Sequence, residues 1–423
     1  MRAAWFEARD RDSLQASPSD DAQVDERLAN DIGRWVIGAA LGGDNEAAVL
    51  DGVCERLRAA GVDLVRVALA GDLLDPTYDG QGVRWNRGQR ASQQRFLRNS
   101  GADTDEEWLR SPFYPLIAGE VDRIRRRLTA GFVRGEFPVL DELADRGGTD
   151  YVALIVRVAE TMRLGDTSGV VSSWTTDAPR GFLDDELALL EAIMPAIAAT
   201  FLWRTSHHAA RTLIQTYLGT DAAQRVLAGN VMRGRAERIR AVVWFSDLVG
   251  FTRLADTTEP DIVLAMLNDY AEAQVESIEA HGGHVLKFIG DGMLAIFPDG
   301  EDGSACARAL DAAADQRRRI DRLNARRSTA GLPVSDTHLA LHIGELLYGN
   351  VGSPRRLDFT VLGPAVNEAA RIEALCGSLD RPVIVSSAFA QAAGEASARL
   401  VSLGRYLLKG VARPQELYTL DPG

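Results

Sequence analysis

The spacing of apolar and polar residues in the second half of the chain switches between strand-like and helix-like patterns. Apolar runs predict strands at residues 241–247, 338–346 and 357–362, and near 383–386, 400–408 and 416–420. Helical spacing occurs at residues 259–281, 302–327 and 364–375. Two short apolar runs flank Gly290-Asp291-Gly292, which predicts a hairpin over residues 284–297 with Asp291 at its tip. This order of elements predicts an α+β, ferredoxin-like core with additions.

The first half has a different pattern. Residues 46–60 predict a helix, and residues 63–71 and the runs YVALIVRV and GVVSSWTT predict strands. Asp184 is a good N-cap for a long helix, because Asp accepts hydrogen bonds from free N–H groups of a first turn. The apolar face of that helix consists of residues at helical spacing: Leu187, Leu190, Met194, Ile197 and Phe201.

These patterns divide the chain into four segments. Residues 1–29 are rich in Asp, Ser, Gln and Arg and predict a flexible tail. Residues 30–204 form one folded unit and residues 240–423 another. Residues 205–239 predict a helical linker that continues to about Ala228 and breaks at Gly229 and Gly234.

Composition narrows the class of protein. The net charge of −13 gives no reason to expect a nucleic acid partner. Three scattered cysteines without a CxxC pair favour a reducing compartment and no zinc site. The most apolar stretch, residues 187–203, contains Glu191 and Pro195, and it is too short and interrupted to predict a membrane span. We therefore expect a cytoplasmic protein with no membrane partner.

The candidate chemistry is a pair of carboxylates at strand ends. Asp247 ends the strand at 241–247 and Asp291 lies at the hairpin tip. Mg²⁺ in proteins is commonly bound by one or two carboxylates together with substrate phosphates, so such a pair suits a site for a divalent cation and a polyphosphate. Taken singly, each Asp has an ordinary explanation as a helix cap or a turn residue.

Three segments decide between these interpretations: FSDLVGFT, KFIGDGMLAIF and DFTVLGPAVNEAARIE. In this order they resemble the signature blocks of the class III nucleotidyl cyclase catalytic domain, over roughly residues 240–420. The resemblance implies that Asp247, Asp291 and the Leu248 carbonyl hold two Mg²⁺ or Mn²⁺ ions. It also implies that Phe251 and Thr252 contact the substrate.

The same resemblance gives roles to the later residues. Lys287 corresponds to the family's lysine that donates to adenine N1, and Thr360 to the second base-selecting position, as in the subgroup called class IIIb. Asn367 would orient the ribose and Arg371 would stabilise charge on the transferring phosphoryl group. Lys409 resembles the lysine that contacts the β and γ phosphates, and the choice between Arg355 and Arg356 as a helper is open.

Lysine usage supports two of these assignments. Of the 47 lysines and arginines, only Lys287 and Lys409 are lysine. A compact ammonium with rotatable donors can make hydrogen bonds in places that a planar guanidinium does not fit, so we expect both lysines to have specific roles. Guanine carries a hydrogen on N1, so the Lys287 ammonium would meet a donor there instead of an acceptor. Guanylyl cyclases of the family typically carry Glu and Cys at the two base-selecting positions. Lys287 with Thr360 thus favours ATP over GTP.

The function that the resemblance implies is an adenylate cyclase that forms 3′,5′-cyclic AMP and pyrophosphate at the interface of a homodimer. The alternatives are a guanylate cyclase and a non-catalytic nucleotide-binding signalling module. No GxxxxGK[ST] phosphate loop is present, so an ATPase interpretation lacks its phosphate-binding loop.

The unit at 30–204 resembles a GAF-type sensory domain in its order of helix, strands and long exit helix. Such a domain implies regulation by an unknown small molecule. Its central aromatic residues allow either a ligand pocket or an ordinary core, and the core is the favoured interpretation: Trp85, Phe96, Trp108, Phe113 and Tyr114.

Overall fold

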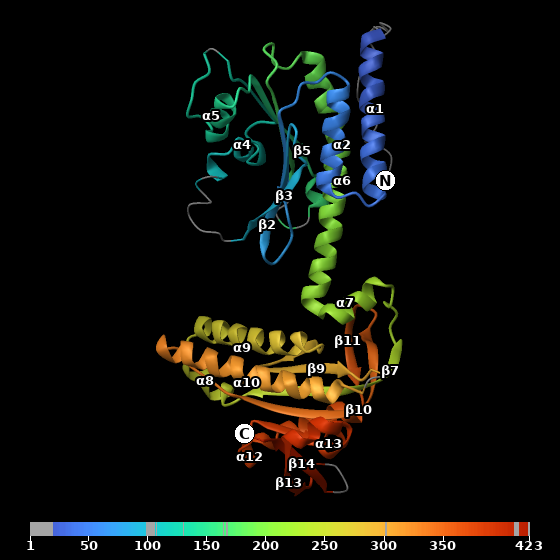
Figure 1. Ribbon diagram of the computed structural model, residues 1–423, viewed down its shortest axis with the longest axis vertical. Coiled ribbons are helices and arrows are strands. Elements are labelled where there is room, and N and C mark those ends of the chain that lie inside the picture. The colour runs from blue at the N-terminus through green and yellow to red at the C-terminus, as the bar shows by residue number, and fades with distance from the viewer. Residues whose placement is uncertain are drawn as a thin grey trace, which may run out of the picture. The chain divides into compact units, whose positions relative to one another are not determined.

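The computed structural model describes residues 20–98, 106, 108–129, 131–163, 165, 168–300, 303–409 and 414–421. The chain divides into two compact units, Met1–Leu213 and Ile214–Gly423. Each unit is built on its own sheet. In Figure 1 the N-terminal unit is coloured from blue to green and the C-terminal unit from green to red.

The N-terminal unit is a six-stranded antiparallel sheet with helices on both faces, in the strand order β3-β2-β1-β6-β5-β4. Its elements are α1 (Asp20–Leu41), α2 (Glu46–Ala59), β1 (Arg66–Asp72), β2 (Tyr78–Asn86), β3 (Ser92–Leu97), α4 (Phe113–Ile117), β4 (Arg123–Arg127), α5 (Pro138–Asp145), β5 (Asp150–Arg157), a 3₁₀ turn at Glu160–Met162, β6 (Gly169–Thr176) and α6 (Asp184–Leu218).

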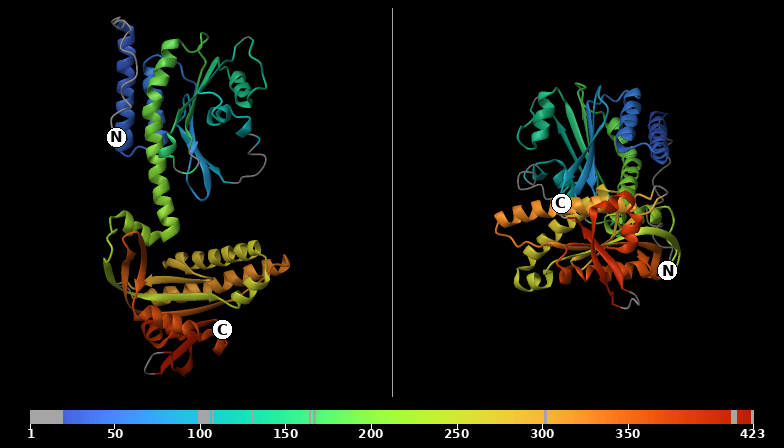
Figure 2. Two further views of the ribbon diagram at one scale, coloured as in Figure 1. Left: turned by 180° about the vertical axis from the view of Figure 1, so that it is seen from behind. Right: turned by 60° about the horizontal axis from the view of Figure 1, so that its bottom comes forward.

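Alternation along the strands assigns the two faces of this sheet to different cores. Val67, Leu69 and Val83 pack with α1, α2 and α6 in one core, whereas Tyr151 and Val171 pack with α4 and α5 in the other. Figure 2 shows the long helix α6 beside α1 and α2. The predicted apolar face of α6 is confirmed, because each of its residues is at most 4% exposed: Leu187, Leu190, Met194, Ile197 and Phe201.

Helix α6 differs from the prediction at both ends. It begins at Asp184 itself, so Asp184 is not the N-cap, and the Glu186 carboxylate accepts a hydrogen bond from the Leu183 N–H at 2.8 Å. It runs without a break through the predicted boundary at residue 204 and ends at Leu218. Among the described residues, α6 is also the one helix long and apolar enough to cross a membrane, and half of its most apolar window is buried in the protein.

Gly219 ends α6, a break that the linker prediction did not include, whereas the predicted end of the helical linker near Ala228 and Gly229 is confirmed by the end of α7 (Thr220–Leu227). The φ of Gly219 is +78°, and an added Cβ would lie 2.6 Å from the Val285 carbonyl oxygen, so both conformation and packing require glycine here. Helix α7 follows Gly219, and its Ala222 packs into a core of the C-terminal unit. In the predicted tail, residues 20–29 belong to α1, and the earlier residues lie outside the described part of the chain.

The C-terminal unit is an eight-stranded sheet with the order β13-β14-β12-β10-β7-β9-β8, and β11 pairs with β10. Its strands are β7 (Ala236–Leu248), β8 (His284–Ile289), β9 (Gly292–Pro298), β10 (Thr337–Ser353), β11 (Arg356–Leu362), β12 (Val383–Ser386), β13 (Leu400–Tyr406) and β14 (Gln415–Leu420). Its helices after α7 are α8 (Phe251–Thr257), α9 (Pro260–Ala280), α10 (Ala305–Thr329), α11 (Pro364–Glu373), α12 (Cys376–Leu379) and α13 (Ser387–Ala392), with a 3₁₀ turn at Gly394–Arg399.

The centre of this sheet confirms the predicted ferredoxin-like core. In chain order, β7, α9, β8, β9, α10 and β10 give the βαββαβ arrangement, and the neighbouring strands β10, β7, β9 and β8 are all antiparallel. Helices α9 and α10 run side by side (Figure 1). Strands β7 and β10 extend beyond the predicted runs, and the end of β10 forms a hairpin with β11, with Gly349 opposite Thr360.

Candidate active site

The sheet register brings the two predicted carboxylates together. Ser246 on β7 pairs with Met293 on β9, so Asp247 lies next to Gly292 and the hairpin tip that carries Asp291. A Cβ on Gly292 would lie 2.5 Å from the Ser246 carbonyl oxygen and 3.1 Å from a carboxylate oxygen of Asp247. Glycine at this position therefore permits the close approach of the two Asp residues.

The electrostatics of this pair indicate a site for a cation. Burial, together with the nearby Asp291 and Glu373, raises the pKa of Asp247 to about 7. Two carboxylates held this close repel each other when both are ionised, and a divalent cation between them removes the repulsion. The oxygen donors present therefore fit Mg²⁺ or Mn²⁺.

The side chains alone do not complete a metal site. Among the described residues, no group of three or more His, Cys, Asp or Glu side chains is arranged to hold a metal ion. This agrees with a site in which substrate phosphates and backbone oxygens supply the remaining ligands. Leu248 lies at the end of β7, and because its side chain is a hydrocarbon, only its backbone carbonyl could serve as an oxygen ligand.

A pH titration of metal binding tests this arrangement. Protons compete with metal for Asp247, so the apparent affinity for Mn²⁺ is expected to fall about tenfold for each pH unit below about 7. For the metal-free protein, a carboxyl whose folded pKa is raised binds its proton more tightly in the folded state. The free energy of unfolding should then fall as pH rises from near 3.8 to about 7.

Calorimetric Mn²⁺ titrations and thermal unfolding at pH 5, 6, 7 and 8 measure both trends. Asp247→Asn should reduce the fall in stability with rising pH in this range, while the exposed carboxyl variant Asp256→Asn should leave it unchanged. Equal Mn²⁺ affinity at pH 5 and pH 8 would contradict the assignment.

The predicted base-selecting residues lie on two strands that come together. Lys287 on β8 forms an ion pair with Asp358 on β11. Asp358 and Thr360 are two apart on β11, so they share a strand face, and Thr360 is 6% exposed. The opposite face of β11 is core, where Phe359 meets Tyr348 edge to face with ring centroids 4.8 Å apart.

Asp358 is a candidate site residue that the sequence did not reveal. The available signal was its position two residues before Thr360 on a predicted strand. Its contact with Lys287 spans 71 residues, however, and could not be deduced without the fold. The carboxylate fixes one of the three ammonium donors of Lys287 and leaves the others free for a ligand.

Helix α11 presents Asn367 and Arg371 on one face, as their spacing predicts. Its opposite face, Ala365, Ala369 and Ile372, is buried against the sheet, where a Cβ on Gly344 would lie 2.7 Å from the Ala365 Cβ. Asn367 is exposed and Arg371 half-buried. In the described part of the chain, no hydrogen bond or ion pair occupies either side chain. Both are therefore available to a ligand.

The remaining predicted contacts are more dispersed. Phe251 and Thr252 open α8 directly after the Asp247 strand, with Thr252 exposed and Phe251 packed partly into the core under α9. Arg355 is exposed in the turn between β10 and β11, and Arg356 is exposed at the first position of β11. Lys409 is exposed in the loop after β13, at the opposite edge of the sheet from β8. A single copy of the chain thus does not bring Lys409 close to Lys287.

Comparisons with known proteins place this unit in a family. Residues 235–422 match the family model "Adenylate and Guanylate cyclase catalytic domain". "Adenylate cyclase" of Anabaena cylindrica is 37% identical over 150 residues, which are 34% of this chain and 29% of that protein. "Adenylate cyclase 1" of Rhizobium meliloti is 28% identical over 180 residues, 41% of this chain and 26% of that protein. The chain therefore spans under a third of the length of both relatives.

Among solved structures, the adenylyl cyclase CyaB from P. aeruginosa is similar with a TM-score of 0.41 and 23% identity, covering 45% of this chain and 97% of that one. The guanylyl cyclase Cya2 has a TM-score of 0.39 and 27% identity, covering 44% and 95%. On the family match and the curated relatives, residues 235–422 form a class III adenylate/guanylate cyclase catalytic domain.

Proposed function

We propose that this protein is an adenylate cyclase that converts ATP to 3′,5′-cyclic AMP and pyrophosphate. The observation that carries the choice of base is the ion pair between Lys287 on β8 and Asp358, which lies two residues from Thr360 on the same face of β11. An ammonium fixed by Asp358 donates to the unprotonated N1 of adenine, whereas guanine presents a donor there. The curated relatives named adenylate cyclases support the same base.

The other side chains fit the transfer of a phosphoryl group. The ribose 3′-oxygen attacks the α-phosphorus, and the bond to the bridging oxygen of the β-phosphate breaks, so pyrophosphate leaves. Asn367 orients the ribose by hydrogen bonding, and Arg371 offsets negative charge that develops on the phosphoryl oxygens. Bound at Asp247, Asp291 and the Leu248 carbonyl, Mg²⁺ or Mn²⁺ would supply Lewis-acid activation of the 3′-hydroxyl and charge neutralisation.

We propose that the active site forms between two copies of the chain. Exposed apolar side chains lie beside the base-selecting residues on β8, β10 and β11, and they are between 37% and 58% exposed: Phe288, Ile289, Leu347, Val351, Leu357 and Leu362. An apolar surface of this kind is typical of a protein interface. Asn367 and Arg371 then face the metal-binding carboxylates of the other copy, as the family resemblance implies.

We further propose that the N-terminal unit is a GAF-like sensory domain that regulates the cyclase. Helix α6 continues from the core of that unit, where Phe201 is 3% exposed, to Leu218 in the C-terminal unit. A ligand of the N-terminal unit changes activity only to the extent that it binds one arrangement of the dimer better than another.

Incubating the purified chain with ATP or GTP and Mn²⁺, and identifying the cyclic product by mass spectrometry, tests the function. Cyclic AMP from ATP, with little cyclic GMP from GTP, is the expected result. Preferential formation of cyclic GMP would support the guanylate cyclase alternative, and no cyclic product from either nucleotide would support the non-catalytic module.

Asp358 gives a sharper test of base selection. Asp358→Asn frees the Lys287 ammonium from its charged partner, so kcat/KM for ATP is expected to fall about tenfold, with a smaller loss for GTP. Asp311→Asn is the matched control, because Asp311 forms a comparable surface ion pair with Arg399 at 2.6 Å on α10. An ATP-to-GTP ratio of kcat/KM that is the same in wild type and both variants would rule out a role for Asp358.

A further inference from the structure

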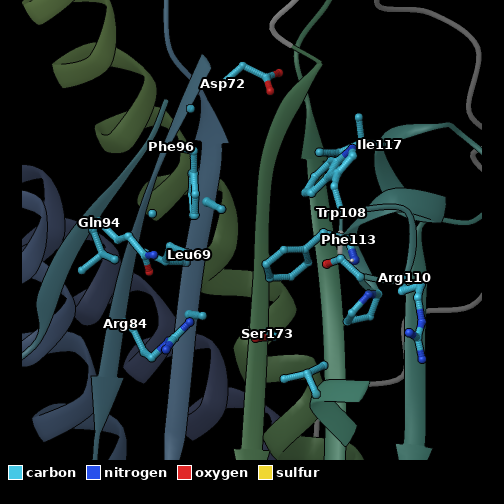
Figure 3. Close-up of a pocket in the computed structure, with 18 of the residues that line it drawn as sticks. Leu69, Asp72, Arg84, Gln94, Phe96, Trp108, Arg110, Phe113, Ile117 and Ser173 are labelled. Atoms are coloured by element: carbon cyan, nitrogen blue, oxygen red, sulfur yellow. Dashed lines mark hydrogen bonds between the residues drawn. The ribbon is translucent and has the colours of Figure 1, made fainter. Parts of the chain in front are cut away.

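The N-terminal unit contains a cavity of about 1170 Å³ on one face of its sheet. Helices α4 and α5 cover this face where it is formed by β5 and β6, through Leu116, Leu140 and Leu143. Over β1, β2 and β3 the same face lines the cavity (Figure 3). Among the described residues, the cavity therefore lies where the helical layer stops short of the sheet edge.

The floor of the cavity is flat because small residues meet across the strands. Ala68 and Ala70 on β1 are followed on β2 by Gly80 and Gly82, with Ala70 paired to Gly82. Aromatic rings form the walls: Phe96 lies on the β3 side, and Trp108 and Phe113 lie on the opposite side (Figure 3). A flat floor between aromatic walls fits a planar apolar group.

Two arginines on this face form no ion pair with any described residue. Arg84 is paired across the strands with Ala68, so Arg66, two residues along β1, is its diagonal neighbour on the same face. Within the described residues, neither guanidinium forms an ion pair or a hydrogen bond with a carboxylate. Burial and the nearby charge of Arg84 lower the pKa of Arg66, and the charge of Glu142 acts in the opposite direction.

The carboxylates that also line the cavity are engaged elsewhere or lie at its rim. Asp79 pairs with Arg98 at 2.9 Å, and Glu142 pairs with Arg146 at 2.9 Å. Asp72 accepts a hydrogen bond from the Ser168 N–H at 3.0 Å, and Glu106 is exposed. Among the described residues, Arg66 and Arg84 therefore keep guanidinium groups that no ion pair occupies, and Glu142 is the lining carboxylate whose charge also acts on Arg66.

We propose that this cavity binds a small organic anion with a flat apolar body, whose carboxylate or phosphate lies between Arg66 and Arg84 and whose body lies over Ala68 and Gly82. This deepens the proposed regulatory role of the N-terminal unit by giving its ligand a chemical class. Arginine binds both carboxylate and phosphate through paired N–H groups, so the two anions share the recognition chemistry.

Calorimetric titration of the full chain with three probes tests the proposal: 2-naphthoate, 2-naphthyl phosphate and the neutral 2-naphthamide. At least one anion should bind with one site per chain, and the amide should bind about tenfold more weakly or worse, because it lacks the charge. The stronger of the two anions identifies whether the site suits a carboxylate or a phosphate.

Matched variants separate recognition from folding. Arg84→Gln and Arg66→Gln should each weaken anion binding about tenfold or more, while Arg90→Gln, the same change in the exposed turn between β2 and β3, should not. Because Arg66 and Arg84 repel each other in the free protein, removing one should leave the melting temperature equal or higher. Ala68→Phe fills the floor without changing charge and should block all three probes.

The proposal is overturned if neither anion binds, if naphthamide binds as tightly as the anions, or if Arg84→Gln binds like Arg90→Gln. Binding is measured directly and without nucleotide, so failure here is distinguishable from failure of the proposed cyclase activity.

Discussion

Asp291→Ala is expected to abolish cyclic nucleotide production, by a thousandfold or more on the scale of about 10³ to 10⁶ seen when groups that act as a unit are removed. Asp291 lies at the tip between β8 and β9, next to Asp247, and the two carboxylates together would form the proposed cation site. Losing one removes a ligand and the charge that retains the cation. Initial rates of product formation with Mn²⁺ measure the effect.

The fold should survive this change. The negative charge of Asp291 contributes to raising the pKa of Asp247, so its removal relieves repulsion, and the metal-free variant should melt at the same temperature or higher. Asp256→Ala, which removes an exposed carboxylate at the end of α8, is the control and should keep full activity. Near wild-type turnover by Asp291→Ala would refute the metal assignment.

The ferredoxin-like core could be predicted because its strands and helices have strong apolar periodicity. The hairpin at Gly290 is an example: φ is +64° there, and Ile289 pairs with Gly292, as the Gly-Asp-Gly sequence indicated. The extension of β10 beyond residue 346 was not predictable in this way. Its residues pair with β11, a partner that only the tertiary fold supplies.

In the N-terminal unit, several strands could not be predicted from the sequence. Strands β2, β3 and β4 were not predicted, because β2 contains Gly80 and Gly82, all of β3 is exposed, and β4 reads RIRRR. Each is stabilised by pairing with a neighbour rather than by its own apolar pattern. The aromatic residues of this region have different roles: Trp85 belongs to the core, Phe96 and Trp108 line the cavity, and Phe113 both lines the cavity and packs against the core under α4 and α5.

The candidate site was predictable as residues but not as contacts. Motif resemblance supplied Asp247, Asp291, Lys287 and Thr360 because each lies in a short ordered block. The contact between Lys287 and Asp358 could not be predicted, because it depends on the packing of β8 against the β10–β11 hairpin. Likewise, the effect of Glu373 on Asp247 depends on how α11 packs on the sheet.

Mixing two inactive variants should restore activity if the site is shared between copies. Asp247→Ala lacks a metal ligand, and Arg371→Ala lacks the guanidinium that offsets charge on the phosphoryl group. In a mixed dimer, one of the two sites contains both lesions and the other contains neither. At equal amounts, half of the dimers are mixed and each has one intact site, so about a quarter of wild-type activity is expected.

The control is a mixture of Asp247→Ala with Asp291→Ala. Each variant has a damaged carboxylate pair, and every site uses the carboxylate pair of one copy. Every site in every dimer is therefore damaged, and activity should stay absent. Subunit exchange is followed separately, by energy transfer between two labelled preparations. If exchange is complete and the first mixture remains as inactive as the control, Asp247 and Arg371 do not act on one substrate from two copies, and the shared site is wrong.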